Sequence, residues 1–134
     1  MKNIAIALRK AQFLAHAGHN LISGPTFIQD HKFLGKLYPA YEESYDSIIE
    51  RMIGLGESVD PLQLTEDAIT SVNAKDVKQD PKSIYDGLLD IEREIQEEIS
   101  DYLSDGVSHG TSNLLEGLAD ESEARIYIFR QSIK

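Results

Sequence analysis

Four long stretches of the chain repeat apolar residues every three or four positions, the period of an α-helix with one buried face. They cover about residues 3–21, 25–55, 81–103 and 109–133, and no stretch of useful length alternates apolar and polar residues as a strand would. The sequence therefore predicts an all-α protein. Its 134 residues suffice for one domain, residues 1–134, and are too few for two comfortable ones.

The connection between the second and third stretches is long and carries a helical signal of its own. Asp60-Pro61 has the pattern of a helix start, because proline is tolerated in the first helical turn. Two antiparallel hairpins joined by a long crossover with a short helix form a ferritin-like four-helix bundle. An up-down-up-down bundle with a floppy loop is the alternative. The apolar residues expected to bury the short helix are Leu62, Leu64, Ile69 and Val72.

The ends of the second helix carry the clearest local signals. Ser23-Gly24-Pro25 separates it from the first helix, and Thr26 with Gln29 offers a capping box as a second way to start it. Gly56 is its predicted stop. Pro39 lies in its interior, where the ring removes one backbone hydrogen bond and predicts a kink.

Two histidines and two carboxylates gather in this first half of the chain. His19 and His31 lie on either side of the predicted turn, and Asp46 and Glu50 follow four residues apart, on one helical face. Imidazole and carboxylate are ligands for first-row metals. The carboxylate pair alone is more often a solvated helix face, as are the adjoining Glu42 and Glu43. For His16 and His109, which fit no recognisable pattern, packing or surface roles are the better interpretation.

The same stretch resembles the Dps family of mini-ferritins. That family's pattern is His, Gly-Pro-x-Phe, His, Asp-x-x-x-Glu-Arg and Leu-Gly. It appears here without a gap as His19, Gly24-Pro25-Thr26-Phe27, His31, Asp46-Ser47-Ile48-Ile49-Glu50-Arg51 and Leu55-Gly56. Other ferritins place Glu-x-x-His motifs inside one bundle, and this chain has none.

The resemblance implies an iron-binding and iron-storage protein that protects against oxidative stress. Fe²⁺ would be oxidised, commonly by hydrogen peroxide, at a site shared by two subunits across a two-fold interface. His19 and His31 would come from one subunit, and Asp46 and Glu50 from its neighbour. Fe³⁺ would then enter a hollow homo-oligomer, expected to be a dodecamer. Under this interpretation the four residues are both the metal ligands and the catalytic residues.

Two departures from the family pattern affect this expectation. A tryptophan usually follows the first histidine, where this chain has Asn20, and a further aspartate usually follows the second histidine, where it has Gly35. With one carboxylate missing, we expect one firm metal position and a weak or absent second one. If that loss is what weakens the site, Gly35→Asp should restore it. The alternative function is therefore a Dps-like cage with weakened or lost ferroxidase activity.

Composition narrows the remaining possibilities. The chain has no cysteine, which excludes disulfides and thiolate chemistry and suits a cytoplasmic location. A net charge of −10 and the lack of a lysine-rich N-terminal tail predict no DNA binding. We expect neither a signal peptide nor a membrane-spanning segment. The acidic cluster of the third helix could face a cation-collecting cavity or only solvent; it consists of Glu92, Glu94, Glu97, Glu98 and Asp101.

A third hypothesis is an up-down helical bundle that acts as a partner-binding module. Its sticky face would be Ile126-Tyr127-Ile128-Phe129 near the end of the last helix. A small particle in solution would favour this module, whereas a large hollow particle would favour the mini-ferritin.

Overall fold

The computed structural model describes residues 1–72, 77 and 79–134, and within them the chain forms helices and no strand. Amphipathic periodicity is the reason, because each long helix has an apolar stripe to bury. The predicted all-α class is confirmed. The helices are α1 (Lys2–Leu21), α2 (Phe27–Gly54), α3 (Pro61–Ser71), α4 (Pro81–Ser104) and α5 (His109–Ser132).

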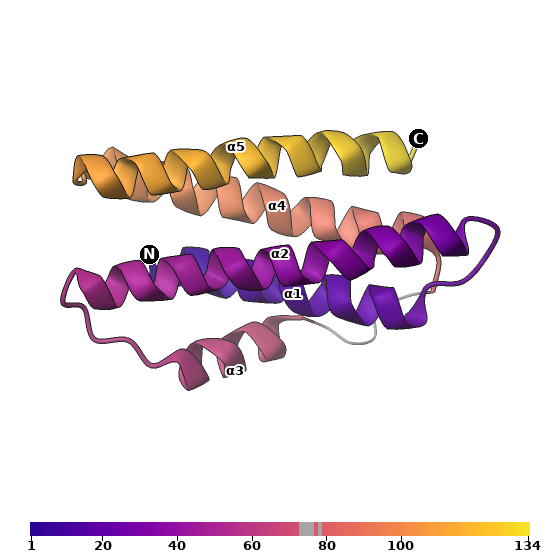
Figure 1. Ribbon diagram of the computed structural model, residues 1–134, viewed down its shortest axis with the longest axis horizontal. Helices are drawn as coiled ribbons and strands as arrows, with labels where there is room; N and C mark the ends of the chain where they lie inside the picture. Colours follow the sequence, from indigo (N-terminus) through magenta and orange to yellow (C-terminus); the bar gives the residue numbers. More distant parts are fainter. Residues whose placement is uncertain (73–76, 78) are drawn as a thin grey trace.

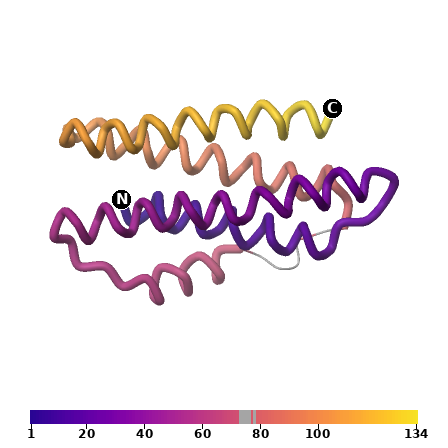
Figure 2. The backbone as a smooth tube through the Cα atoms, in the orientation of Figure 1, coloured from indigo at the N-terminus to yellow at the C-terminus, as the bar shows by residue number. Residues whose placement is uncertain are grey.

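The four long helices pack as two antiparallel hairpins (Figure 1). Helices α1 and α2 form one hairpin and α4 and α5 the other, while α3 packs along α1. Helices α2 and α4 run in the same direction, so the connection between them carries the chain back along the bundle. This is the predicted crossover with a short helix, and it excludes the up-down-up-down alternative. Figure 2 shows the two termini at opposite ends of the bundle.

The helix ends mostly follow the sequence signals. Asp60 accepts hydrogen bonds from the backbone N–H groups of Leu62 and Gln63 at the start of α3. Gly56 and Gly106 follow α2 and α4 with φ values of 84° and 74°, the left-handed conformation that glycine adopts without strain.

The start of α2 differs from the prediction. The helix begins at Phe27, so Pro25 lies before its first turn, and the capping box with Gln29 does not form. The Thr26 hydroxyl instead donates to the Asp30 carboxylate at 2.5 Å. Pro39 lies inside α2, which continues as one helix to Gly54.

Most of the predicted core stripe residues are buried. On α4, the apolar stripe is buried throughout and consists of Ile84, Leu88, Ile91, Ile95 and Ile99. On α3, the expected burial is confirmed for Leu64 and wrong for Leu62 and Ile69, which are exposed. The face proposed for partner binding is also split by the helical period, since Ile126 and Phe129 are buried and Tyr127 and Ile128 point outward.

Candidate metal centre

The turn between α1 and α2 brings His19 and His31 together as a stacked pair. Their ring centroids lie 3.9 Å apart and the ring planes differ by 17°. Each ring is also tied to the other helix, because Nδ1 of His19 lies 2.8 Å from the His31 carbonyl oxygen and Nδ1 of His31 lies 2.8 Å from the His19 carbonyl oxygen. We call this arrangement the histidine pair. Its two hydrogen bonds link the last turn of α1 to the second turn of α2.

These hydrogen bonds fix which ring nitrogen carries the proton. A carbonyl oxygen only accepts, so Nδ1 of each histidine is the donor. In a neutral imidazole the lone pair is then on Nε2, the atom left to bind a metal. Holding one ring nitrogen by a backbone carbonyl is the usual way in which proteins orient a metal-binding histidine.

The stacking limits how the histidine pair could bind metal. A histidine lone pair points outward in the ring plane, and a first-row ion lies about 2.0–2.1 Å from the nitrogen. An ion midway between two rings stacked 3.9 Å apart would lie well outside both planes. The two imidazoles therefore cannot share one ion in this arrangement, and each can serve its own.

Further aromatic rings extend the histidine pair on both sides. Phe27 stacks on His31 with centroids 5.0 Å apart, and Tyr38 is tilted against His19 at 5.5 Å. The His16 ring stacks on Tyr38 at 4.0 Å. Sequence reasoning gave His16 a packing or surface role, and the structure shows an exposed side chain whose ring packs on Tyr38.

Asp46 and Glu50 lie farther along α2 and are exposed. Fifteen residues separate His31 from Asp46 on one helix, which corresponds to about 22 Å at the usual rise of about 1.5 Å per residue. Among the described residues, no group of three or more histidine, aspartate or glutamate side chains is close enough to hold a metal. A single subunit thus brings the two histidines together but not the carboxylates.

A second polar cluster lies in the centre of the bundle. We call it the core cluster, and it consists of Tyr41, Glu92, Ser122 and Arg125. The fully buried Glu92 carboxylate accepts hydrogen bonds from the Tyr41 hydroxyl, the Ser122 hydroxyl and the Arg125 guanidinium. This corrects the expectation that Glu92 faces a cavity or solvent. Its spacing from Leu88 and Ile95, which are buried on the same helix, is the signal that could have shown this.

Charge within the core cluster is balanced by the protein itself. The Arg125 guanidinium also lies 4.8 Å from the centroid of the Tyr41 ring. Burial, and then the negative charge of Glu92, raise the pKa of the Tyr41 hydroxyl well above its usual value. Burial lowers the pKa of Arg125, but the hydrogen bond to Glu92 and the nearby charges of Tyr41, Glu92 and Glu121 together outweigh burial and raise this pKa overall. A bundle centre that already holds a cation leaves this carboxylate no free lone pair to offer a metal.

Glu42 is likewise engaged. Its carboxylate accepts a hydrogen bond from the Gln12 amide at 2.6 Å, and Gln12 in turn accepts one from Arg9 at 2.8 Å. Within the part of the chain that the structure describes, the acidic side chains of α2 without a side-chain partner are therefore Glu43, Asp46 and Glu50.

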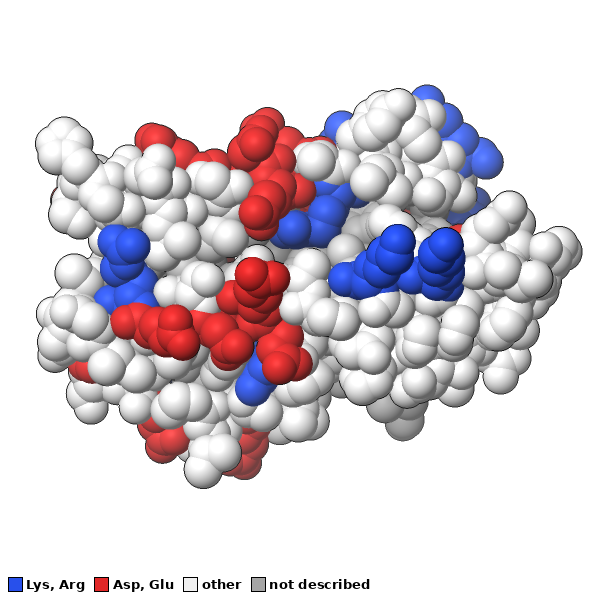
Figure 3. All heavy atoms as spheres, in the orientation of Figure 1, with Lys and Arg blue, Asp and Glu red and all other residues white. Residues whose placement is uncertain are grey.

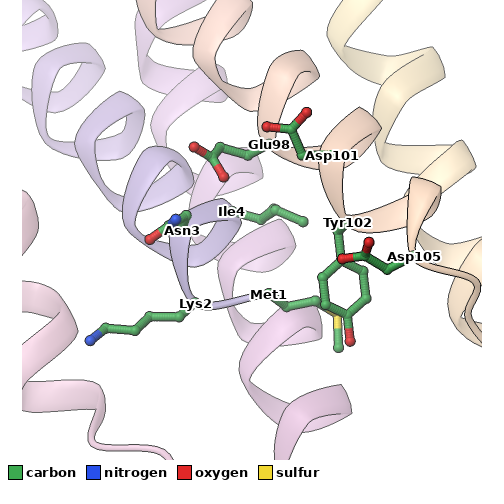
Figure 4. A pocket seen from close by; sticks show the side chains of 8 residues that line it. All are labelled: Met1, Lys2, Asn3, Ile4, Glu98, Asp101, Tyr102 and Asp105. Atoms are coloured by element: carbon green, nitrogen blue, oxygen red, sulfur yellow. The ribbon is translucent and has the colours of Figure 1, made fainter.

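An acidic cleft of about 370 Å³ lies at the other end of the bundle from the histidine pair. Figure 4 shows Glu98 and Asp101 of α4, followed by Asp105, along one side of it and residues 1–4 along the other. The cleft contains none of the predicted metal ligands. Its carboxylates do not by themselves distinguish a binding site from a solvated acidic surface.

The family model of the ferritin-like domain matches residues 7–134. No curated protein matches the sequence. Among the described residues, no helix is both long and apolar enough to cross a membrane.

Proposed function

The chain belongs to the ferritin-like domain family, and from this premise we propose that it is a Dps-type mini-ferritin that oxidises Fe²⁺ and stores Fe³⁺. The observation that carries the proposal is the histidine pair, in which hydrogen bonds hold both Nδ1 atoms and leave both Nε2 atoms for a metal. Members of this family generally bind iron and usually form oligomers, in agreement with such a site.

A second copy of the chain would supply the carboxylates. Suppose that the α2 helices of two subunits pack antiparallel, with a two-fold axis near Pro39 and Ala40. Residues equally far from this axis on its two sides then lie next to each other, so residue 31 of one copy lies beside about residues 47–49 of the other. Asp46 and Glu50 of the partner subunit would then flank His31. This arrangement removes the distance of about 22 Å that separates His31 from Asp46 within one subunit.

The charges on the outer face of α2 support this pairing. Lys32 and Lys36 are exposed before Pro39, whereas Glu43, Asp46 and Glu50 are exposed after it. Figure 3 shows basic side chains on one half of this face and a band of acidic side chains on the other. Antiparallel pairing about the middle of α2 brings opposite charges together, whereas parallel pairing brings like charges together.

In the proposed reaction, each imidazole holds one Fe²⁺ and the partner's carboxylates complete the ligand sets. Two Fe²⁺ ions give one electron each to one molecule of hydrogen peroxide. The O–O bond breaks, two protons are taken up, and two water molecules and two Fe³⁺ ions result. The protein's part is to fix the nitrogen and oxygen ligands and leave open coordination positions for the oxidant. The Fe³⁺ would collect inside a hollow oligomer, with a dodecamer expected from the Dps resemblance.

The alternative is a Dps-like cage with weakened or lost oxidation chemistry. Asn20 and Gly35, which replace a tryptophan and an aspartate of the Dps pattern, favour it. The two functions separate in one assay. A large particle that takes up Fe²⁺ but does not accelerate its oxidation by peroxide supports the alternative.

The test of the proposed function is Glu50→Gln, with Glu123→Gln as the matched control on the exposed face of α5. Peroxide-dependent Fe²⁺ oxidation and Fe²⁺ binding by calorimetry should fall strongly in Glu50→Gln and stay unchanged in Glu123→Gln. Both variants should fold, and loss of acidic repulsion would if anything stabilise the metal-free protein. Equal activity in both variants would show that Glu50 is only a solvated helix residue.

A further inference from the structure

Gly35 lies against the ring of His19. A Cβ atom added at position 35 would lie 2.9 Å from Cε1 and 3.1 Å from Nδ1 of that imidazole. Real Cβ contacts essentially never fall below 3.0 Å, so either the ring or the helix would have to move. The ring thus occupies the space that any larger side chain at position 35 would fill.

The His19 ring has little freedom to move aside. Its Nδ1 donates to the His31 carbonyl, its face stacks on the His31 ring, and Tyr38 is in contact with it. A shift that accommodates a Cβ at position 35 would disturb the stacking and the hydrogen bond that fixes the proton on Nδ1.

We propose that Gly35 is a positioning residue for the metal site. Its missing side chain allows the His19 imidazole to lie directly on the α2 backbone, where the histidine pair forms. The part of this proposal that concerns iron oxidation rests on the proposed function. It reverses the expectation drawn from the Dps pattern, because an aspartate at position 35 and the histidine pair compete for the same space.

Substitution at position 35 should therefore weaken metal binding, even when the new side chain is itself a possible ligand. Removing a group that orients a metal-binding histidine typically lowers metal affinity about 10- to 100-fold. We expect losses in this range for Gly35→Ala and no gain for Gly35→Asp. Both should be measured with Zn²⁺, which is redox-inactive and so separates binding from oxidation.

Two other glycines supply matched controls. A Cβ added at Gly117 on α5 would have no atom of another described residue within 4 Å. Gly117→Ala should therefore impair neither folding nor metal binding. A Cβ at Gly87 on α4 would lie 2.9 Å from the Leu14 side chain, so Gly87→Ala introduces comparable crowding away from the histidine pair. If Gly87→Ala lowers Zn²⁺ affinity as much as Gly35→Ala does, crowding in general is the cause and the proposal fails.

The most direct measurement is nitrogen-15 NMR of the metal-free protein, which reports the ring tautomers without any catalytic activity. The unmodified chain should show protons on Nδ1 of both His19 and His31, and Gly35→Ala should lose or shift both signals. Gly87→Ala should keep them. Unchanged histidine signals in Gly35→Ala, or tighter metal binding in Gly35→Asp, would overturn the proposal.

A double-mutant cycle keeps the test valid if Gly35→Ala folds poorly. In a His19→Ala background the ring is gone, so Gly35→Ala should no longer lower the melting temperature. An equal loss in both backgrounds would contradict contact with His19 as the cause. If the tautomer signals and the cycle behave as expected but the protein does not oxidise iron, the positioning of the histidine pair stands and the proposed function fails.

Discussion

The histidine pair and the core cluster are both polar groups at helix–helix contacts, but they differ in what they leave unsatisfied. In the core cluster the Glu92 carboxylate is surrounded by donors and faces the Arg125 cation. In the histidine pair, the hydrogen bonds formed among the described residues reach only Nδ1 of each ring and leave the lone pair on Nε2. A cluster whose polar atoms all have hydrogen-bond partners indicates a structural role. A cluster that holds its rings in fixed orientation but leaves a nitrogen lone pair unused indicates a ligand-binding site.

The comparison predicts the largest loss of stability from Arg125→Ala. Removing the guanidinium leaves Glu92 buried without its counter-charge, and breaking a buried pair in this way costs about 3–5 kcal/mol. Urea denaturation of the metal-free protein measures the change. Arg93→Ala is the control, because Arg93 pairs with Asp90 at 3.3 Å on the exposed surface, where such pairs contribute about 0.2–1 kcal/mol. Similar losses in both variants would refute the structural role of the core cluster.

Metal affinity, in contrast to stability, should depend on the histidine pair and not on the core cluster. His19→Ala removes one nitrogen ligand and should lower Zn²⁺ affinity at least about tenfold, or about 1.4 kcal/mol. Glu92→Gln removes the buried charge but not a ligand, so its Zn²⁺ affinity should match that of the unmodified protein. Calorimetry on both folded variants checks this. A large loss of affinity in Glu92→Gln would mean that the bundle interior takes part in metal binding.

Alkaline pH should weaken the core cluster. The folded pKa of Tyr41 is raised above its unfolded value of about 10, so the folded state keeps this proton after the unfolded state has lost it. Stability from Tyr41 is therefore complete below about pH 10 and falls above it by about 1.4 kcal/mol per pH unit. Ultraviolet titration of tyrosinate should show Tyr41 ionising only with unfolding, and early ionisation of all six tyrosines would contradict this.

The smallest predicted effect concerns the charges on α2 outside the histidine pair. If the two-fold axis lies between residues 39 and 40, Lys36 comes level with Glu43 of the partner subunit. Lys36→Glu and Glu43→Lys should each weaken subunit association at low salt, by about 0.2–1 kcal/mol per exposed pair. The double variant restores opposite charges and should recover association. Sedimentation of the three variants decides it, and a double variant weaker than both single ones would exclude this register.

Much of the fold could be predicted because each long helix carries its own apolar period. The crossover followed from the length of the connection and from Asp60-Pro61, and Gly56 marked a helix end that the structure confirms. Leu62 and Ile69 were expected in the core, but both are exposed. Periodicity shows that a helix has an apolar face, but it does not show how much of that face another helix covers.

The candidate site could be predicted only in part. The resemblance to the Dps pattern implied that His19 and His31 of one subunit serve one site, but no sequence rule gives their reciprocal hydrogen bonds or the ring that fills the space over Gly35. These depend on how closely α1 and α2 approach. Glu92 was missed for a related reason, since a glutamate on a charged helix is usually solvated and only its partners on other helices reveal that it is buried.

Arg125 supplies the positive charge that balances the buried Glu92 carboxylate, so the centre of the bundle needs no metal ion for this purpose. Proteins whose buried carboxylates require a metal ion unfold when a chelator removes that ion. Here a side chain of the protein itself supplies the balancing charge. Under the proposed function, a subunit of this kind would keep its shape when iron is scarce, and its ligands would already be in place when Fe²⁺ becomes available.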